Sequence, residues 1–278
     1  MKLGVAYIVF DGIELLEKSI IQIREHVDFI TIIYQHRSWF GDLINPSDLK
    51  ILQSLKNKGL VDSLIEFKKF IPVKHKSIKG ITGSKYYETI KRQLGLKTCL
   101  LNGCTHYLCM DVDEFYISSE FKKAKKIIIS NNYARTAVRF LNYVNIPIIH
   151  RGIDPNSVPF ICKIDNNSKL GSSFFVRCDP TRGITNGSNI NHSFNQNIIT
   201  MHHMETVRKD LFKKYNSTTR KIFKRERTSE LINELRKVNS ESSSFSFNKI
   251  IFPATGKINL HKVNNIFNID YKNWNNGS

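Results

Sequence analysis

The chain has few cysteines and no long apolar run. Its 278 residues include five cysteines, an odd number without the paired spacing of zinc sites or the density of a disulfide-rich secreted domain. No segment approaches the roughly 20 apolar residues that a membrane-spanning helix needs. The first apolar run reaches Asp11 too early for a secretory signal peptide. We therefore expect a cytoplasmic protein in a reducing compartment, either soluble or peripheral to a membrane.

Acidic residues are also scarce. The chain has 24 Asp and Glu against 42 Lys and Arg, a formal net charge of +18. Such an excess indicates an anionic partner, which could be a nucleotide diphosphate, a phospholipid surface or nucleic acid. Charge alone does not choose among these partners, because basic surface residues are usually just solvated.

The N-terminal third has the pattern of a βαβ unit. Residues 3–10 form a β-rich apolar run, residues 12–26 have helical periodicity, and residues 28–34 return to β-branched residues. Strands that are apolar without alternation are typical of parallel sheets covered on both faces. The sequence therefore predicts an open α/β sheet, whose ligands bind beyond the C-terminal ends of the strands.

Further elements are predicted along the rest of the chain. Helices are expected at 47–58, at 84–94, in a second stretch that ends at Gly103, and at 119–130, and a basic helical region is expected over 205–238. Strands are expected at 60–67, 106–110, 136–144 and 198–201. The segment 147–193 is rich in Gly, Pro, Asn and Ser and is predicted to be long loops with a short strand at 173–177.

The most informative segment is Tyr107-Leu-Cys-Met-Asp-Val-Asp-Glu-Phe-Tyr116. A buried strand delivers Asp111 and Asp113 at positions i and i+2, and alternate strand residues share a face. Both carboxylates can therefore converge on one cation at the strand's C-terminal edge. Mg²⁺ or Mn²⁺ bound by one or two carboxylates typically completes its shell with water and substrate phosphates, so the spacing suits a diphosphate.

This strand and its Asp-Val-Asp-Glu-Phe-Tyr sequence resemble the Asp-x-Asp segment of A-type glycosyltransferases, over roughly residues 3–225. The resemblance implies a Rossmann-like open mixed sheet flanked by helices, with a basic helical C-terminal extension. It implies a nucleotide-diphosphate sugar donor, usually UDP-linked. Asp111 would lie near the ribose or the metal, Asp113 would bind Mn²⁺ or Mg²⁺ directly, and Glu114 would support the site or face the sugar.

The same resemblance points to further site residues. A histidine downstream of the acidic motif often adds a metal or diphosphate contact, and here it is His202 or His203, with His203 favoured. The donor would lie against the ends of the first two strands and the helix before the motif. These candidate donor-binding residues are Val9, Phe10, Asp11, Gln35, His36, Lys85, Arg92, Asp111 and Val112. Lys85, Glu88 and Arg92 have the spacing of one helix face.

Two roles remain open between several residues. Arg208, Lys213 or Lys214, in the basic stretch after the histidines, could neutralise the departing diphosphate. Inverting transfer also needs a carboxylate that takes the acceptor's proton, whereas a retaining reaction needs no such base, and the sequence does not decide between the two. The candidates for this base are Asp154, Asp165 and Asp179, and we favour Asp179.

The expected organisation is a catalytic domain at 1–225 and an extension at 226–278. The catalytic domain has a nucleotide-sugar-binding half, 1–116, and an acceptor-binding half, 117–225. The predicted activity is that of a hexosyl- or pentosyltransferase that acts on a glycan or glycoconjugate. The alternatives are a nucleotidyltransferase, which usually needs a Gly-rich phosphate loop beside the first strand, and a basic nucleic-acid- or membrane-surface-binding protein. No nucleic-acid reader motif supports the last alternative, and we expect no specific nucleic-acid partner.

Overall fold

The computed structural model describes residues 1–38, 41–68, 77–78, 81–171, 173–217, 225–246, 257–272 and 274. It begins with β1 (Leu3–Val9), α1 (Ile13–Ile23), the 3₁₀ turn η1 (Arg24–His26) and β2 (Phe29–Tyr34). Strands β1 and β2 pair in parallel. The predicted βαβ unit is therefore confirmed. It is followed by α2 (Pro46–Asn57) and β3 (Ser63–Glu66), which lies parallel to β2.

The main sheet has the order β3-β2-β1-β6-β9-β8-β13-β7. Its other strands are β6 (His106–Asp111), β7 (Glu114–Phe115), β8 (Arg135–Val144), β9 (Ile146–Lys163) and β13 (Met201–His203). β6 is parallel to β1, whereas β9 runs antiparallel to both β6 and β8. The fold is thus an open mixed sheet flanked by helices, as predicted, and its parallel half ends at the acidic motif.

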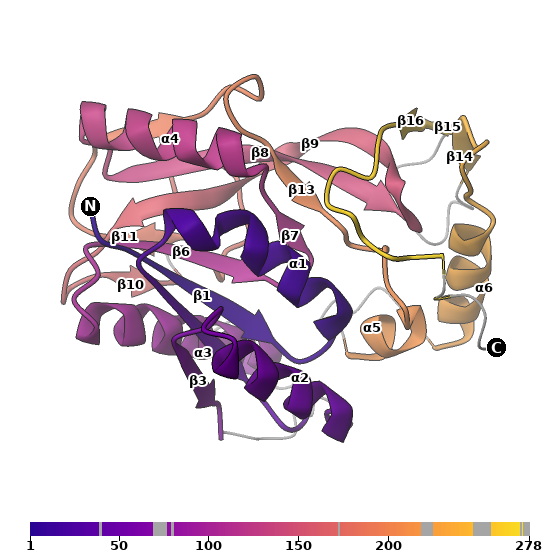
Figure 1. Cartoon of the computed structure of the whole chain (residues 1–278), viewed down its shortest axis with the longest axis horizontal. Helices are drawn as coiled ribbons and strands as arrows, with labels where there is room; N and C mark the ends of the chain where they lie inside the picture. The colour runs from indigo at the N-terminus through magenta and orange to yellow at the C-terminus, as the bar shows by residue number, and fades with distance from the viewer. Residues whose placement is uncertain are drawn as a thin grey trace.

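Helices cover both faces of this sheet (Figure 1). Buried residues of α1, α2 and α4 (Ser118–Asn131) form one apolar core with Val5, Tyr7 and Val9 of β1. The alternate residues Ala6 and Ile8 pack in a second core on the other face, under α3 (Gly83–Leu101). Continuous burial of β1 therefore follows from coverage on both sides.

The segment 147–193 differs most from the prediction. An 18-residue strand, β9, replaces the expected loops, and it forms a hairpin with β8 that is interrupted by register shifts. Proline lacks an N–H donor, so Pro147, Pro155 and Pro159 hid the strand from a pattern-based assignment. The short strand expected at 173–177 is wrong. In addition, α3 is one continuous helix, and the histidines lie within β13 rather than after a strand.

The C-terminal part packs on the β8–β9 hairpin. It contains α5 (Leu211–Ser217), α6 (Arg225–Arg236), β14 (Ser244–Ser246), β15 (Lys257–Asn259) and β16 (His261–Lys262), which lie at the side of the molecule opposite the N-terminus (Figure 1). Leu231 and Ile232 of α6 share a core with Ile146 and Ile149, and β16 pairs with β9. Short strands occur at β4 (Ser77–Ile78), β5 (Ile81–Thr82), β10 (Lys169–Leu170), β11 (Ile184–Thr185) and β12 (Asn191–Ser193). Among the described helices, none has the length and apolar character to cross a bilayer.

Candidate functional site

A cleft of about 690 Å³ lies beyond the C-terminal ends of β1 and β6. Eight carboxylates and eight Lys or Arg side chains line it, so the cleft is balanced in charge although the chain carries +18. The acidic lining residues are Asp11, Glu88, Asp111, Asp113, Glu114, Asp154, Asp179 and Glu205; the basic ones are Lys85, Lys91, Arg92, Arg151, Arg177, Arg182, Arg208 and Lys214. The overall positive charge therefore does not mark this site.

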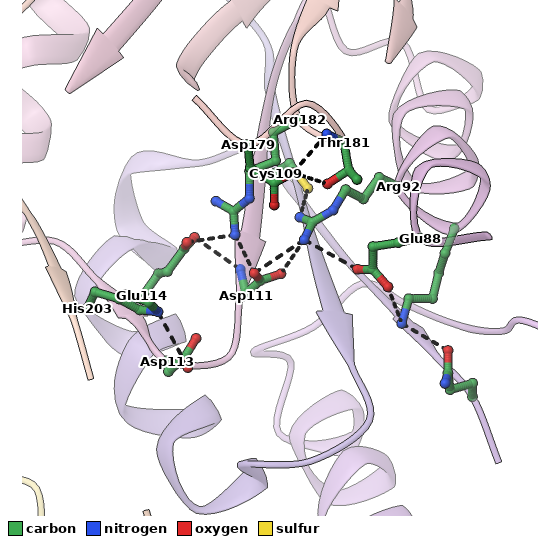
Figure 2. A network of polar contacts seen from close by, with 12 residues as sticks. Glu88, Arg92, Cys109, Asp111, Asp113, Glu114, Asp179, Thr181, Arg182 and His203 are labelled. Atoms are coloured by element: carbon green, nitrogen blue, oxygen red, sulfur yellow. Dashed lines mark hydrogen bonds and ion pairs between the residues drawn. The ribbon is translucent and has the colours of Figure 1, made fainter. Parts of the chain in front are cut away.

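Asp111 ends β6 and is held by two buried arginines. Oδ1 of Asp111 lies 3.1 Å from Nη2 of Arg92, and Oδ2 contacts Nη2 of Arg182 (Figure 2). Burial alone would raise the pKa of Asp111, but Arg182 and Arg92 outweigh burial and hold this pKa well below its ordinary value. Asp111 is therefore ionised and already neutralised by protein groups.

Glu114 closes the turn that follows β6. Its Oε2 accepts a hydrogen bond from the backbone N–H of Asp111 at 3.1 Å, and its Oε1 lies 2.6 Å from Nη2 of Arg182. Arg92 also pairs with Glu88 one helical turn earlier in α3, at 3.3 Å. The predicted shared face of Lys85, Glu88 and Arg92 is confirmed, since all three side chains line the cleft.

Asp113 forms ion pairs with a different set of basic residues. Its Oδ2 lies 2.5 Å from Nη2 of Arg208 and 2.6 Å from Nζ of Lys214. Burial would raise the pKa of Asp113, but Lys214 and Arg208 outweigh it and keep the pKa well below the ordinary value. Both cations come from the basic stretch after β13. The fold therefore brings side chains about 100 positions away in the sequence to one oxygen of Asp113.

His203 faces the same oxygen of Asp113. Its Nε2 lies 3.6 Å from Oδ2 of Asp113 (Figure 2), and its Nδ1 lies 3.0 Å from Oδ1 of Asn142. Asn142 donates its own N–H to Asp154 at 2.9 Å, which assigns Oδ1 as the acceptor of the His203 Nδ1 proton. Nε2 is then the ring nitrogen that faces the carboxylate of Asp113, and a cation between these two atoms could be bound by both.

His202 lies on the opposite side of β13, because neighbouring strand residues alternate. Its Nδ1 is hydrogen-bonded to the hydroxyl of Tyr143 at 2.9 Å, and its ring packs on Phe267. It does not line the cleft. The structure thus separates the two histidines and brings only His203 to the acidic motif.

Asp113, unlike Asp111, faces a histidine that could share a metal ion with it. Within the described ranges, no three His, Cys, Asp or Glu side chains group as a complete metal cage. Mg²⁺ and Mn²⁺ do not need one, since they commonly combine one or two protein ligands with water and phosphates. Asp113 and His203 supply such a pair, although Arg208 and Lys214 already contact Oδ2 of Asp113. Asp111 instead lies between the guanidinium groups of Arg92 and Arg182. The ligands predicted from the sequence therefore divide into two sets.

Most of the predicted donor-binding residues gather at the cleft. Phe10, Asp11, Gln35, Lys85, Arg92, Asp111 and Val112 all line it. Val9 is completely buried in the core. His36 lies outside the lining, with Nε2 3.8 Å from Glu66. Lys213 also lies outside it, paired with Asp48 at 3.1 Å and positioned 5.9 Å from the centre of the Phe10 ring.

Arg208 carries unused donors next to the acidic motif. Its side chain is only 4% exposed, yet its Nε and Nη1 have no hydrogen-bond partner among the described residues. Nη1 lies against Gly12 at the start of α1, where a Cβ would come within 1.3 Å of it. Unsatisfied buried donors are costly, and Arg208 also lines the cleft.

Two of the three candidate bases line the cleft, namely Asp179 and Asp154. Asp165 does not. Oδ1 of Asp179 accepts hydrogen bonds from the backbone N–H and the hydroxyl of Thr181, at 2.8 and 2.9 Å. Burial opposes ionisation of Asp179, but Arg92, Arg182 and these hydrogen bonds outweigh it and lower its pKa. Asp179 is therefore ionised and able to accept a proton.

Sequence reasoning missed Arg182, Asn142 and the pairing of Lys214 with Asp113. Arg182 lies in a Pro-Thr-Arg turn inside the segment predicted to be loops, and no periodicity distinguishes it. Its only signal was the presence of three acids beside a buried strand, which requires buried cations nearby.

No protein-family model matches the chain, and no curated protein matches it. Among solved structures, it is similar to residues 1–349 of S. aureus TarS, with 10% identity over 85% of this chain and 71% of that one and a TM-score of 0.45. It is also similar to TarS 1–349 in complex with UDP-GlcNAc, with 15% identity over 51% of this chain and 35% of that one and a TM-score of 0.35. A third similar structure is the S. cerevisiae mannosyltransferase Ktr4p, with 12% identity over 52% of this chain and 40% of that one and a TM-score of 0.27. The chain spans 22%, 36% and 35% of the length of three TarS structures. Because these TM-scores are below 0.5, the fold assignment rests on the sheet order and helices described above.

Proposed function

We propose that the cleft binds a nucleotide-diphosphate sugar, most favourably a UDP-sugar, and transfers the sugar to a glycan or glycoconjugate. The observation that carries this proposal is the convergence of Asp113, His203, Arg208 and Lys214 at the C-terminal edge of a parallel sheet. Ligands of open α/β sheets bind at this edge. The combination of a two-ligand cation position with an arginine and a lysine suits a diphosphate.

The diphosphate would lie between Arg208 and Lys214. Arg208 offers Nε and Nη1, which lack hydrogen-bond partners among the described residues, and each could donate a charge-assisted hydrogen bond to a phosphate oxygen. Asp113 and His203 would hold Mn²⁺ or Mg²⁺, which supplies Lewis-acid stabilisation of the leaving diphosphate. Metal dependence follows from these residues and is part of the proposal.

The nucleoside would occupy the part of the cleft between β1 and α3. Phe10 offers an aromatic ring there, and Gln35 is oriented by two contacts. Its Nε2 donates to the carbonyl of Arg37 at 2.8 Å, and its Oε1 accepts from Lys91 at 2.9 Å. Lys85 is exposed at the rim of the same region. These groups give the donor site one apolar and several polar contacts.

We propose an inverting reaction with Asp179 as the general base. The acceptor oxygen attacks the anomeric carbon, its proton passes to the carboxylate of Asp179, and the bond between the anomeric carbon and the diphosphate breaks. The electron pair leaves with the diphosphate, where Arg208 and Lys214 offset the negative charge. The lowered pKa of Asp179 keeps it ionised at neutral pH, although it also makes the carboxylate a weaker base.

Calorimetric titration tests the proposal. The purified protein is titrated with UDP and with GDP, with and without Mn²⁺, alongside Asp113→Asn and the matched surface variant Glu230→Gln. We expect Mn²⁺-dependent binding of UDP that falls at least about tenfold in Asp113→Asn and is unchanged in Glu230→Gln, since Glu230 is exposed on α6.

The same experiment separates the alternatives. Absence of nucleotide binding under every condition would remove the transferase proposal and favour a nucleic-acid or membrane partner. Binding of UTP with release of pyrophosphate would instead identify a nucleotidyltransferase, whereas release of UDP from a UDP-sugar supports sugar transfer.

A further inference from the structure

Lys213 and Lys214 are neighbours on α5 but hold different carboxylates. Nζ of Lys213 lies 3.1 Å from Asp48 at the start of α2, whereas Nζ of Lys214 lies 2.6 Å from Oδ2 of Asp113. Leu211 and Tyr215 anchor this helix in the core beside the β8–β9 hairpin. α5 therefore presents one lysine to α2 and the next one to the acidic motif of the cleft.

Three partners compete for a single oxygen atom. Oδ2 of Asp113 lies 2.5 Å from Arg208, 2.6 Å from Lys214 and 3.6 Å from Nε2 of His203. A divalent ion bound to Asp113 and His203 would lie within a few ångströms of the Lys214 ammonium, and like charges this close repel strongly. Arg208 and Lys214 together already use the two lone pairs of Oδ2, so the ion can bind this oxygen only if one of the two cations leaves it.

Lys214 is the partner that is able to move. The side chain of Arg208 is 4% exposed and also lies 3.8 Å from Asp11, so it is fixed on two sides. The side chain of Lys214 is 17% exposed, and a lysine ammonium sits on a flexible four-carbon stem that repositions easily. A diphosphate arriving at the cleft would offer this ammonium a new anionic partner.

We propose that Lys214 blocks the metal position in the donor-free protein and moves from Asp113 to the diphosphate when donor and metal bind together. This inference rests on the proposed function. Its consequence is coupling between two ligands: the nucleotide removes a competitor of the metal, and the metal frees a cation for the nucleotide. Linkage requires the two effects to be equal.

Electron paramagnetic resonance measures this coupling, because free hexaaqua Mn²⁺ gives a sharp signal that is lost on binding. Mn²⁺ affinity is determined with and without UDP for the wild type, Lys214→Met and Lys209→Met. Lys209→Met is the matched control, because it removes one exposed positive charge five residues before Lys214. Circular dichroism confirms that each variant is folded.

In the absence of UDP, we expect Lys214→Met to bind Mn²⁺ about tenfold more tightly than the wild type, within the usual range of coupling between sites. UDP should then improve Mn²⁺ binding less in this variant than in the wild type. Lys214→Arg, which keeps the charge, should behave like the wild type, and Lys209→Met should change Mn²⁺ affinity by less than about twofold.

Equal Mn²⁺ affinity in Lys214→Met and the wild type would overturn the inference while leaving the proposed function intact, provided that UDP still binds. The inference would also be overturned if Lys209→Met gained as much Mn²⁺ affinity as Lys214→Met, because the gain would then come from the lower net charge and not from Lys214 itself. Failure of UDP to bind any folded variant, with or without Mn²⁺, would contradict the proposed function and with it the exchange.

Discussion

Nη2 of Arg182 lies 2.6 Å from Oε1 of Glu114, and both side chains are at most 5% exposed. The same nitrogen contacts Asp111 (Figure 2). A turn some 70 residues downstream of the acidic motif therefore supplies the cation that lets Glu114 be buried and that also neutralises the part-exposed Asp111. Asp113 is left as the carboxylate that faces a histidine.

Arg182→Met should be strongly destabilising. Removing one partner of a buried ion pair leaves uncompensated charge and typically costs about 3–5 kcal/mol. Urea denaturation at pH 7 measures the change in the free energy of unfolding. Adding Glu114→Gln to this variant should restore part of the loss, because it removes one of the unpaired carboxylates. A loss below about 1 kcal/mol, the value of an exposed pair, would show that Arg182 does not hold the motif.

Gly12→Ala should damage the site as well as the fold. Gly12 has φ +73°. A Cβ added there would lie only 1.3 Å from Nη1 of Arg208 and 2.8 Å from Cγ2 of Val112. Gly59 has φ +71° and open space around it, so Gly59→Ala is a matched control for backbone strain, about 1–2 kcal/mol. We expect a larger loss of stability in Gly12→Ala, and weaker UDP binding in that variant alone. Equal effects of the two substitutions would contradict the placement of Arg208.

The parallel half of the fold could be predicted because its signals are local. Apolar β-rich runs alternate with helical periodicity, and buried strands covered on both faces give the continuous pattern seen in β1 and β6. The motif Asp111-Val-Asp113 was visible because it ends such a strand. Its position at the cleft follows directly from parallel topology.

The remaining features could not be predicted because they depend on long-range contacts. β9 contains prolines and a glycine, which interrupt regular pairing. Register shifts between β8 and β9 accommodate these residues, and no local sequence pattern predicts such shifts. The pairing of each carboxylate with its cations also depends on tertiary structure. Arg182 pairs with Asp111, whereas Arg208 and Lys214 pair with Asp113. Which histidine faces the site depends on the exact position of β13, and a shift by one residue would have exchanged His202 and His203.

Stability should decrease as the pH falls from about 6.5 towards 4, in part because of His150. Burial and, secondarily, the neighbouring His261 lower the pKa of His150 from 6.5 to about 4. Tyr143 also packs against its ring, and Gly152 donates a backbone hydrogen bond to its Nδ1. Between these two pH values the unfolded chain binds the proton and the folded chain does not, so the free energy of unfolding rises with pH.

His150→Phe should reduce this pH dependence. The full shift corresponds to about 3 kcal/mol as an upper limit, present above pH 6.5 and lost by about pH 4. Urea denaturation at several pH values measures the slope for the wild type and the variant. Identical slopes would mean that His150 does not stay neutral in the folded protein.

The assignment of the general base predicts a kinetic difference between two carboxylates. Asp179→Asn should lower kcat by about 10²–10⁴-fold with little effect on the KM for the donor, since a general base acts mainly in the transition state. Asp154→Asn should have a smaller effect on kcat, because Asp154 is engaged by Asn142 and Asn156 and orients His203 through Asn142. The reverse order of effects would move the base to Asp154.

A crystal structure with UDP and Mn²⁺ tests the central claim most directly. Anomalous scattering locates Mn²⁺ independently of the nucleotide. We predict an anomalous peak within coordination distance of Oδ2 of Asp113 and Nε2 of His203, with the diphosphate beside Arg208 and the Lys214 ammonium no longer on Asp113. A nucleotide bound away from this cleft, or Mn²⁺ bound at Asp111 while Lys214 remains on Asp113, would contradict the account.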